Sequence, residues 1–236
     1  MSDVHGNAVA LEATLVELVP LAPDLVVFGG DLTWGPLPEA TLALVRELPL
    51  PTLRVRGNAE RALLEPDEDA SERTRWLLDR HPPETLAFLE TFVEQASVDV
   101  GGLGPVRFCH GSPRSDEELV TPETPGGRFR ALMDGVPEQV LVTAHTHLQF
   151  DREVEGVRSV NPGSVGMAYG VPPGTACWAL LGPDVELRQT PFSVERATAL
   201  YRASGDPAAE QMLEVLLAPP TLAEVVEHAE RLEFSG

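Results

Sequence analysis

Lysine is absent from this chain of 236 residues, and all 17 of its basic residues are arginine. This absence excludes chemistry that depends on a lysine amine, including Schiff bases and the lysine of a phosphate-binding loop. Cysteine is scarce as well. Cys109 and Cys177 lie in apolar, strand-like contexts without CxxC spacing, so we expect two buried free thiols.

Basic charge is also in short supply. The chain carries 37 acidic and 17 basic residues, so its formal net charge is −20 and its pI is about 4.5. Sequence-independent binding of nucleic acid needs a basic surface that displaces phosphate counterions, so we expect no nucleic-acid partner. An anionic membrane surface is disfavoured too. An acidic protein can still act on phosphate esters if metal ions reverse the potential at its site.

No apolar run is long enough to span a membrane, and no signal peptide is evident at the N-terminus. We therefore expect a cytoplasmic protein without a membrane partner. A chain of 236 residues can bury a substantial core, and no repeat or low-complexity linker interrupts it. We expect residues 1–236 to form a single domain, and the sequence leaves open whether that domain forms a homo-oligomer.

The first sixty residues alternate helical and strand-like segments. Apolar residues follow helical spacing in AVALEATLVELV (8–19), which Asn7 can cap, and in PEATLALVREL (38–48). The runs DLVVFGG (24–30) and PTLRVRGN (51–58) are typical of buried strands. Helices that alternate with buried strands predict βαβ units and a parallel sheet.

The remainder of the chain changes character twice. Residues 59–95 are charged and helical with no strand-like run, which predicts a helical cap. Short strand-like runs from 97 to 190, with glycines at the turns, predict an antiparallel half that is rich in hairpins. Amphipathic stretches at 193–234 predict C-terminal helices.

Polar side chains of one chemical kind follow the buried strands. All are carboxylates, carboxamides or imidazoles, which bind divalent transition metals. The carboxyl ends of the strands of an open α/β sheet form a common crevice, so we expect these side chains to converge. Flanking glycines would let the backbone turn sharply and approach a ligand. The residues are Asp3, His5, Asp31, Asn58, His110, His145 and His147.

These residues lie in motifs that read, in order, D-x-H-G-N, G-G-D, G-N, H-G-S-P and H-T-H, followed by NPGSVG at 161–166. The order resembles the calcineurin-like metallophosphoesterases, most closely their small bacterial and archaeal phosphodiesterase branch, over residues 2–170. The segment GDLTWGP (30–36) differs from the G-D-x-x-D-R-G of protein phosphatases. The resemblance implies a four-layer α/β sandwich, in which two mixed sheets pack face to face with helices outside, and a small helical cap.

The resemblance also implies roles for the seven residues. Asp3, His5 and His147 would bind one divalent metal ion, and Asn58, His110 and His145 would bind a second. Asp31 would bridge the two ions, and we assign catalytic positions to Asp31 and Asn58. A hydroxide shared by the two metals would attack phosphorus in line. The nitrogen and oxygen donors suit two ions of Mn, Fe, Zn, Co or Ni.

Several other polar residues are candidates for substrate contacts. Arg56, Arg61 and Arg114 adjoin the motifs and can hold a phosphate through two hydrogen bonds, although surface ion pairs would explain them equally well. Asn7 either contacts the phosphate or only caps a helix. Asn161 and Ser164 can support the ligands, and Trp34 either lines the pocket or packs in the core. We expect His81 and His228 to be surface residues.

Two features depart from the family pattern. Ala59 stands where many members have a histidine, so a general acid is missing, which favours diesters with good leaving groups over alkyl monoesters. Family members also carry a buried strand before S-D-x-H, whereas this sequence starts at Met1. Either the start was assigned too late or another segment fills the gap. We hypothesise that a chain without this strand has a defective first metal site.

The sequence therefore predicts a metal-dependent phosphoric ester hydrolase, with a small phosphoester or nucleotide as substrate. A phosphodiester is favoured. One alternative is a pyrophosphohydrolase of dinucleoside polyphosphates, which would use the same metals on an anhydride bond. Another is a metal-poor scaffold that binds a phosphorylated ligand or a protein partner without turnover. Neither the natural substrate nor the native metals follow from the residues.

Overall fold

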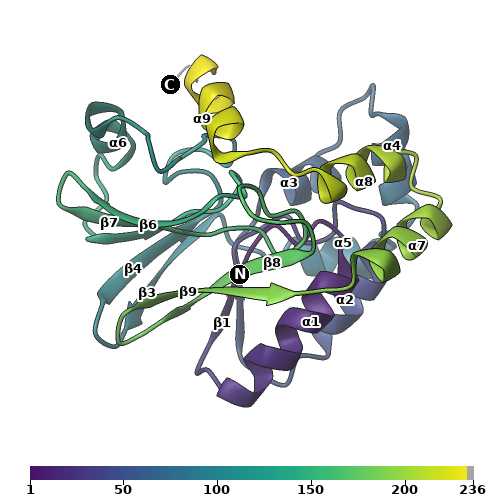
Figure 1. Ribbon diagram of the computed structural model, residues 1–236, viewed down its shortest axis with the longest axis horizontal. Helices are drawn as coiled ribbons and strands as arrows, with labels where there is room; N and C mark the ends of the chain where they lie inside the picture. Colours follow the sequence, from purple (N-terminus) through teal and green to yellow (C-terminus); the bar gives the residue numbers. More distant parts are fainter. Residues whose placement is uncertain (233–236) are drawn as a thin grey trace.

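The computed structural model of the chain describes residues 1–232, which form a mixed α/β fold (Figure 1). None of the helices in this range is long and apolar enough to cross a membrane. The elements up to residue 100 are α1 (Ala8–Leu18), η1 (Val19–Leu21), β1 (Val26–Phe28), α2 (Pro38–Arg46), β2 (Thr52–Arg54), α3 (Asn58–Leu64), α4 (Glu72–Leu78), α5 (Pro83–Leu89) and β3 (Gln95–Val100). The later elements are β4 (Gly104–Cys109), α6 (Gly126–Leu132), β5 (Val140–Val142), β6 (Gln149–Val154), β7 (Val157–Pro162), β8 (Thr175–Leu181), β9 (Val185–Pro191), α7 (Val194–Ser204), α8 (Ala209–Leu217) and α9 (Leu222–Arg231). Residues 233–234 of the predicted C-terminal helices lie outside the described range.

The largest sheet is mixed and has the strand order β3-β4-β5-β7-β6. Its outer pairs, β3 with β4 and β6 with β7, are antiparallel hairpins. Its inner pairs, β4 with β5 and β5 with β7, are parallel. The expectation of an antiparallel second half was therefore wrong for the centre of this sheet. The segment between β4 and β5 contains α6, and a long crossover of this kind returns the chain parallel to itself.

Two further strand pairs complete the β structure. β1 pairs in parallel with β2 after the crossover through α2, as the alternating pattern predicts. β8 and β9 form an antiparallel hairpin. These sheets and the surrounding helices are consistent with the predicted sandwich (Figure 1).

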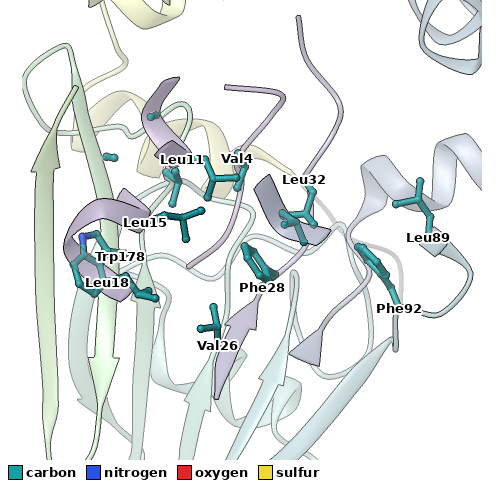
Figure 2. Packing of buried hydrophobic residues seen from close by; sticks show 14 of the residues in the cluster. Val4, Leu11, Leu15, Leu18, Val26, Phe28, Leu32, Leu89, Phe92 and Trp178 are labelled. Atoms are coloured by element: carbon teal, nitrogen blue, oxygen red, sulfur yellow. The ribbon is translucent and has the colours of Figure 1, made fainter. Parts of the chain in front are cut away.

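Helix α1 anchors the main hydrophobic cluster. The side-chain oxygen of Asn7 accepts a hydrogen bond from the N–H of Ala10 and so caps the helix. Leu11, Leu15 and Leu18 recur at helical spacing and are buried. Figure 2 shows them directed into a cluster that also contains Trp178 of β8. This packing places residues 3–7, which directly precede α1, against the ends of the strands.

Residues 1–3 run between two backbone segments. The amino group of Met1 donates to the carbonyl of Val27, and the N–H of Gly29 donates to the carbonyl of Met1. On the other side, the N–H of Val165 donates to the carbonyl of Ser2. Next to Met1 lies an apolar groove of about 780 Å³, lined by residues of β1, β4 and β8 among others. Within residues 1–232, no segment fills this groove.

Candidate metal centre

The seven candidate ligands lie at the ends of strands or in the turn before α1. Asp31 follows β1, and Asn58 begins α3 just after β2. His110 follows β4, and the TAHTH segment with His145 and His147 follows β5. Backbone hydrogen bonds join these segments, because the N–H of Asp3 donates to Gly30 and that of Ala144 donates to His110. The sheet edges therefore bring together residues that are far apart in the sequence.

The candidate ligands form two groups. Asp3, His5 and His147 make one, and Asp31, His110 and His145 make the other; within each group the ligand atoms lie within 4.8 Å of one another. Asn58 adjoins the second group, because its Oδ1 lies 3.0 Å from Nε2 of His110. This is the division that the family resemblance implies.

The carboxylate of Asp31 lies between the two groups. Its Oδ2 is 3.7 Å from Nε2 of His5, and its Oδ1 is 3.5 Å from Nε2 of His110. Oδ1 also accepts a hydrogen bond of 3.0 Å from the N–H of Ala59. Each oxygen thus faces a different group, as a carboxylate that bridges two cations requires.

The hydrogen bonds of the imidazoles test whether the site suits a cation. Nδ1 of His5 lies 3.2 Å from the carbonyl of Trp34, and Nδ1 of His147 lies 2.8 Å from that of Met167. A carbonyl only accepts, so each Nδ1 carries a proton, and in this tautomer the lone pair of the ring is on Nε2. Those two Nε2 atoms lie only 3.0 Å apart. Two facing lone pairs repel each other unless a cation is bound.

A buried carboxylate oxygen of Asp3 also indicates that the first group suits a cation. Oδ1 of Asp3 is buried without a hydrogen-bond partner, at 3.4 Å from Nε2 of His147. An unsatisfied buried carboxylate oxygen is costly, and metal coordination is a common way to satisfy it. The residues at the first group therefore fit a divalent cation.

The electrostatics of the site keep Asp31 ionised and the rings of His5 and His145 neutral. Burial lowers the pKa of His5 and that of His145 to about 4. Burial opposes ionisation of Asp31, but the neighbouring His110, His5 and His145 outweigh it and hold the pKa of Asp31 well below its usual value. For His110, burial is outweighed by Asp31, which raises the imidazole pKa to about 10. These are ligand forms that bind metals, except that His110 must give up a proton.

Five of the candidate ligands have left-handed backbone conformations, which the sequence did not predict. Their φ angles are 51° for Asp3, 48° for His5, 53° for Asp31, 64° for His145 and 59° for His147. For residues other than glycine this conformation costs about 1 kcal/mol or more. Such strain clusters where a structure holds side chains in a functional arrangement.

Two glycines are required by close backbone approach. A Cβ on Gly57 would lie 2.1 Å from Oδ1 of Asp31. Gly30 has a φ of 100°, and a Cβ there would lie 2.6 Å from Nδ1 of His110. Gly30 and Gly57 therefore leave the space in which the side chains of Asp31 and His110 lie.

The sequence analysis did not identify Glu60, whose carboxylate binds the backbone on both sides of the second group. The side chain is completely buried, and its carboxylate accepts hydrogen bonds from the N–H groups of Asp31, Leu32 and Gly57 at 2.8–2.9 Å. Burial and the charge of Asp31 raise the pKa of Glu60 to about 7. The acid that follows G-N in the motif was the available signal.

Replacing Glu60 with glutamine should loosen this loop. A glutamine amide nitrogen cannot accept, so backbone N–H groups now bonded to Oε2 would be left unpaired at a cost of about 1–3 kcal/mol. We expect a lower urea midpoint together with weaker metal retention. Glu17→Gln, at an exposed position of α1, is the matched control. An unchanged midpoint in Glu60→Gln would contradict this role.

Asn161 and Ser164 support the ligand loops. The amide of Asn161 donates to the carbonyl of Ala144 at 2.8 Å and to the hydroxyl of Thr146 at 3.0 Å. The hydroxyl of Ser164 donates to the carbonyl of Asp3 at 2.6 Å. The NPGSVG segment therefore braces both TAHTH and the turn that carries Asp3.

The four predicted substrate contacts all have partners within the protein. Arg61 pairs with Asp116 and Glu117, Arg114 with Glu118, and Arg56 with Glu94. These arginines line a cavity of about 280 Å³ that also reaches His110. The amide nitrogen of Asn7 donates to Gly166, so both polar atoms of its side chain bond to backbone.

A second cavity, of about 470 Å³, opens above the candidate ligands. Its floor contains His5, Asp31, Asn58, His145 and His147. Its walls are Trp34, Ala59, Ala62, Arg73, Met167, Tyr169, Gln211, Met212 and Val215. The wall residues come from the loops after β1 and β7, from helices α3 and α4, and from the C-terminal helix α8. Trp34 therefore lines the pocket, and the contribution of α8 was not foreseen.

The expectation that His81 is a surface residue was wrong. Its side chain is buried, with Nδ1 donating to the carbonyl of Leu77 at 2.7 Å and Nε2 lying 2.9 Å from the hydroxyl of Thr33. Burial lowers its pKa, which favours the neutral ring. His81 therefore links α4 to the loop that carries Asp31, a long-range contact that no local pattern indicates.

His81→Ala should separate stability from metal binding. Both buried hydrogen bonds and the packing of the ring are lost, at a cost of about 2–4 kcal/mol in the free energy of unfolding. We expect metal content per folded chain to stay unchanged, because His81 is not among the grouped ligands. His228→Ala on the exposed side of α9 is the control. Loss of metal from folded His81→Ala protein would refute this assignment.

Comparisons with known proteins identify the family of the chain. Residues 1–181 match the calcineurin-like phosphoesterase superfamily domain. A metallophosphoesterase from Sphaerobacter thermophilus is 25% identical, with a TM-score of 0.73 over 95% of this chain and 97% of that one. A hypothetical protein from Pyrococcus horikoshii OT3 shares the fold, at 18% identity and a TM-score of 0.77 over 92% of this chain and 95% of that one. No curated protein matches. The chain belongs to the calcineurin-like phosphoesterase superfamily.

Proposed function

We propose that the protein is a dinuclear metal-dependent phosphoesterase that hydrolyses phosphodiesters. The observation that carries this proposal is Asp31, whose two carboxylate oxygens face two separate groups of candidate ligands. Asp3, His5 and His147 would hold one ion, and Asn58, His110 and His145 the other. Two divalent cations there would supply Lewis acidity and an activated water for in-line attack on phosphorus.

The protein itself orients the imidazole rings and determines which ring nitrogen carries the proton. The carbonyls of Trp34 and Met167 fix the tautomers of His5 and His147, so that both Nε2 atoms point inward without a proton. The ionised carboxylate of Asp31 and the neutral rings of His5 and His145 favour cation binding, and His110 would give up its proton when a metal binds. We further propose that helices α3, α4 and α5 act as a cap on a single domain, because Ala59, Ala62 and Arg73 line the cavity above the ligands.

Position 59 supports diesters as the substrate class. The side chain of Ala59 lines the cavity but has no proton to give, and its N–H is already bonded to Asp31. Without a general acid the leaving group departs as an anion, which costs least when its own pKa is low. Arg56, Arg61 and Arg114 stay predicted phosphate contacts beside His110.

The proposal is tested by metal content and turnover. Elemental analysis of Mn-treated protein should give two ions per chain. Bis-p-nitrophenyl phosphate should be hydrolysed with added Mn²⁺, and faster than p-nitrophenyl phosphate. Failure to hydrolyse either ester would reject the enzyme, and fewer than two ions per chain together with that failure would favour the metal-poor scaffold that binds a phosphorylated ligand or a protein partner. Cleavage of a dinucleoside polyphosphate in preference to the diester would reject the diester class.

A further inference from the structure

The cavity above the candidate metal centre has walls of a different character from its floor. Around the polar ligands stand two aromatic side chains, two thioethers and small apolar groups: Trp34, Tyr169, Met167, Met212, Ala59, Ala62 and Val215. Its volume of about 470 Å³ is more than an inorganic phosphate needs and falls in the range of small-molecule sites. The walls therefore have room for an organic group attached to the phosphate.

The aromatic residues border the first group of ligands. The ring of Tyr169 lies 4.6 Å from the ring of His147 and is tilted by 37°. The backbone carbonyl of Trp34 accepts from Nδ1 of His5. Both residues line the same cavity as His5 and His147, so their side chains border the space that an ester group on a bound phosphate would enter. Flat aromatic surfaces of this kind favour rings over short alkyl groups.

Helix α8 provides a preformed wall. Met212 is buried in a cluster with Val9, Tyr201 and Leu213, which fixes the helix against the body of the protein. Gln211 and Val215, half-buried or exposed on the same helix, face the cavity. In Figure 1 α8 lies near the cap helices α3 and α4. The size of any bound group is thus limited by α8 as well as by the cap.

The charge of the walls argues against a second phosphate. Among residues 1–232, Arg73 is the single arginine that lines this cavity, and its Nη2 lies 2.9 Å from the buried carboxylate of Asp206. The N–H of Ala208 also donates to Asp206, so this carboxylate is fixed. A guanidinium compensated by a fixed carboxylate attracts an additional anion weakly. The walls therefore favour an uncharged ring over another phosphoryl group.

We infer that this cavity binds an uncharged ring-bearing ester group of the substrate, such as an aryl or nucleoside group, and that Val215 and Ala62 set its size. The inference rests on the proposed phosphoesterase function, because it places the phosphate at the metal centre. It identifies α8 and α3 as the elements that determine specificity. Substrates with only short alkyl groups leave the walls unfilled.

Product-like monoesters test the pocket through their binding affinity, since each carries a single ester group. Calorimetry on Mn-loaded protein should give a Kd for phenyl phosphate at least about tenfold lower than for methyl phosphate, as burial of a ring predicts. Thymidine 5′-monophosphate, as a nucleoside ester, should also bind more tightly than methyl phosphate. Val215→Trp, which fills the cavity from α8, should reduce the phenyl preference to less than about twofold. Its Kd for methyl phosphate should stay close to that of the wild type.

Two further variants keep the test decisive. Leu217→Trp adds the same ring to α8 at a side chain that is 48% exposed and not part of the cavity, and should keep the full preference. Ala62→Phe narrows the cavity from α3, and replaces Val215→Trp if that variant does not unfold cooperatively. Equal affinity of the wild type for phenyl and methyl phosphate would overturn the inference, as would a preference that survives both cavity-filling variants. A preference that holds in a protein without diesterase turnover would support the pocket and reject the proposed function.

Discussion

Asp31→Asn is expected to reduce metal content from two ions per chain to one or none and to lower diester hydrolysis about a thousandfold or more. The carboxylate of Asp31 faces both ligand groups, with Oδ1 3.5 Å from Nε2 of His110 and Oδ2 3.7 Å from Nε2 of His5. Asparagine keeps the shape and the acceptor for the N–H of Ala59 but loses the charge and one donor oxygen. Two bound ions would together supply Lewis acidity and an activated water, so we expect loss of the bridging carboxylate to remove several kcal/mol of transition-state stabilisation.

The measurement is elemental analysis together with kcat/KM on bis-p-nitrophenyl phosphate. Asp99→Asn, at an exposed position of β3, removes the same charge away from the site and should change neither value. His145→Ala should give an intermediate result, with the second ion lost and the first retained, because His145 belongs to the Asp31 and His110 group. Full metal content and activity in Asp31→Asn would contradict the dinuclear assignment.

Joining an extended apolar segment of about six residues in front of Met1 is expected to raise the melting temperature by about 5–10 °C. Residues 1–3 already run beside β1, and the groove of about 780 Å³ continues from Met1 between β1 and β8. Each of these two strands pairs on one side only. An added strand would bury apolar side chains at about 1.5–3 kcal/mol each against about 1.5 kcal/mol of ordering entropy per residue. A net gain of a few kcal/mol corresponds to this shift at 236 residues.

The amino group of Met1 gives this prediction a pH dependence. Burial lowers its pKa from 8.0 to about 6. A base whose pKa falls on folding binds fewer protons in the folded state, so it destabilises that state as pH drops below 8, and the penalty is complete below about 6. An extension turns this amine into an amide and removes the penalty, so the gain should be larger at pH 6 than at pH 8.5. This is checked by thermal unfolding at both values.

A glycine and serine extension of the same length is the matched control. It also converts the amine into an amide, but it brings no apolar side chains into the groove. It should therefore reproduce the pH-dependent part of the rise in melting temperature. It should give little of the rise that comes from burying apolar side chains in the groove. Equal melting temperatures for the apolar and the glycine and serine extensions would show that the groove does not bind a strand.

The candidate site was predictable from the sequence to an unusual degree because its residues occur in short local motifs. D-x-H-G-N, G-G-D, G-N, H-G-S-P and H-T-H each combine a ligand type with a turn that a strand end requires. The helix of residues 8–18 and the parallel pair β1 and β2 followed from periodicity for the same reason. These features depend on neighbours within a few residues, which the sequence records directly.

Other features depend on contacts between distant segments. Sequence reasoning placed His81 on the surface because the two prolines after it suggest a turn, whereas its burial depends on Thr33, 48 residues away. Glu60 looks like one more acid in a charged helix until its three backbone partners are seen. The parallel centre of the large sheet likewise depends on which way a crossover returns.

By itself, the sequence determined the chemistry of this protein: imidazole, carboxylate and carboxamide ligands without lysine or a cysteine motif, arranged at strand ends. Only the tertiary structure decided how these residues combine. It brought the Nε2 atoms of His5 and His147, 142 residues apart in the sequence, to within 3.0 Å of each other. It also directed the two carboxylate oxygens of Asp31 toward the two ligand groups. It also placed α8, about 150 residues beyond Asn58, in the wall of the cavity. The physical reason is that ligand identity is a property of single residues, whereas spacing and pocket shape come from packing among elements far apart in the chain.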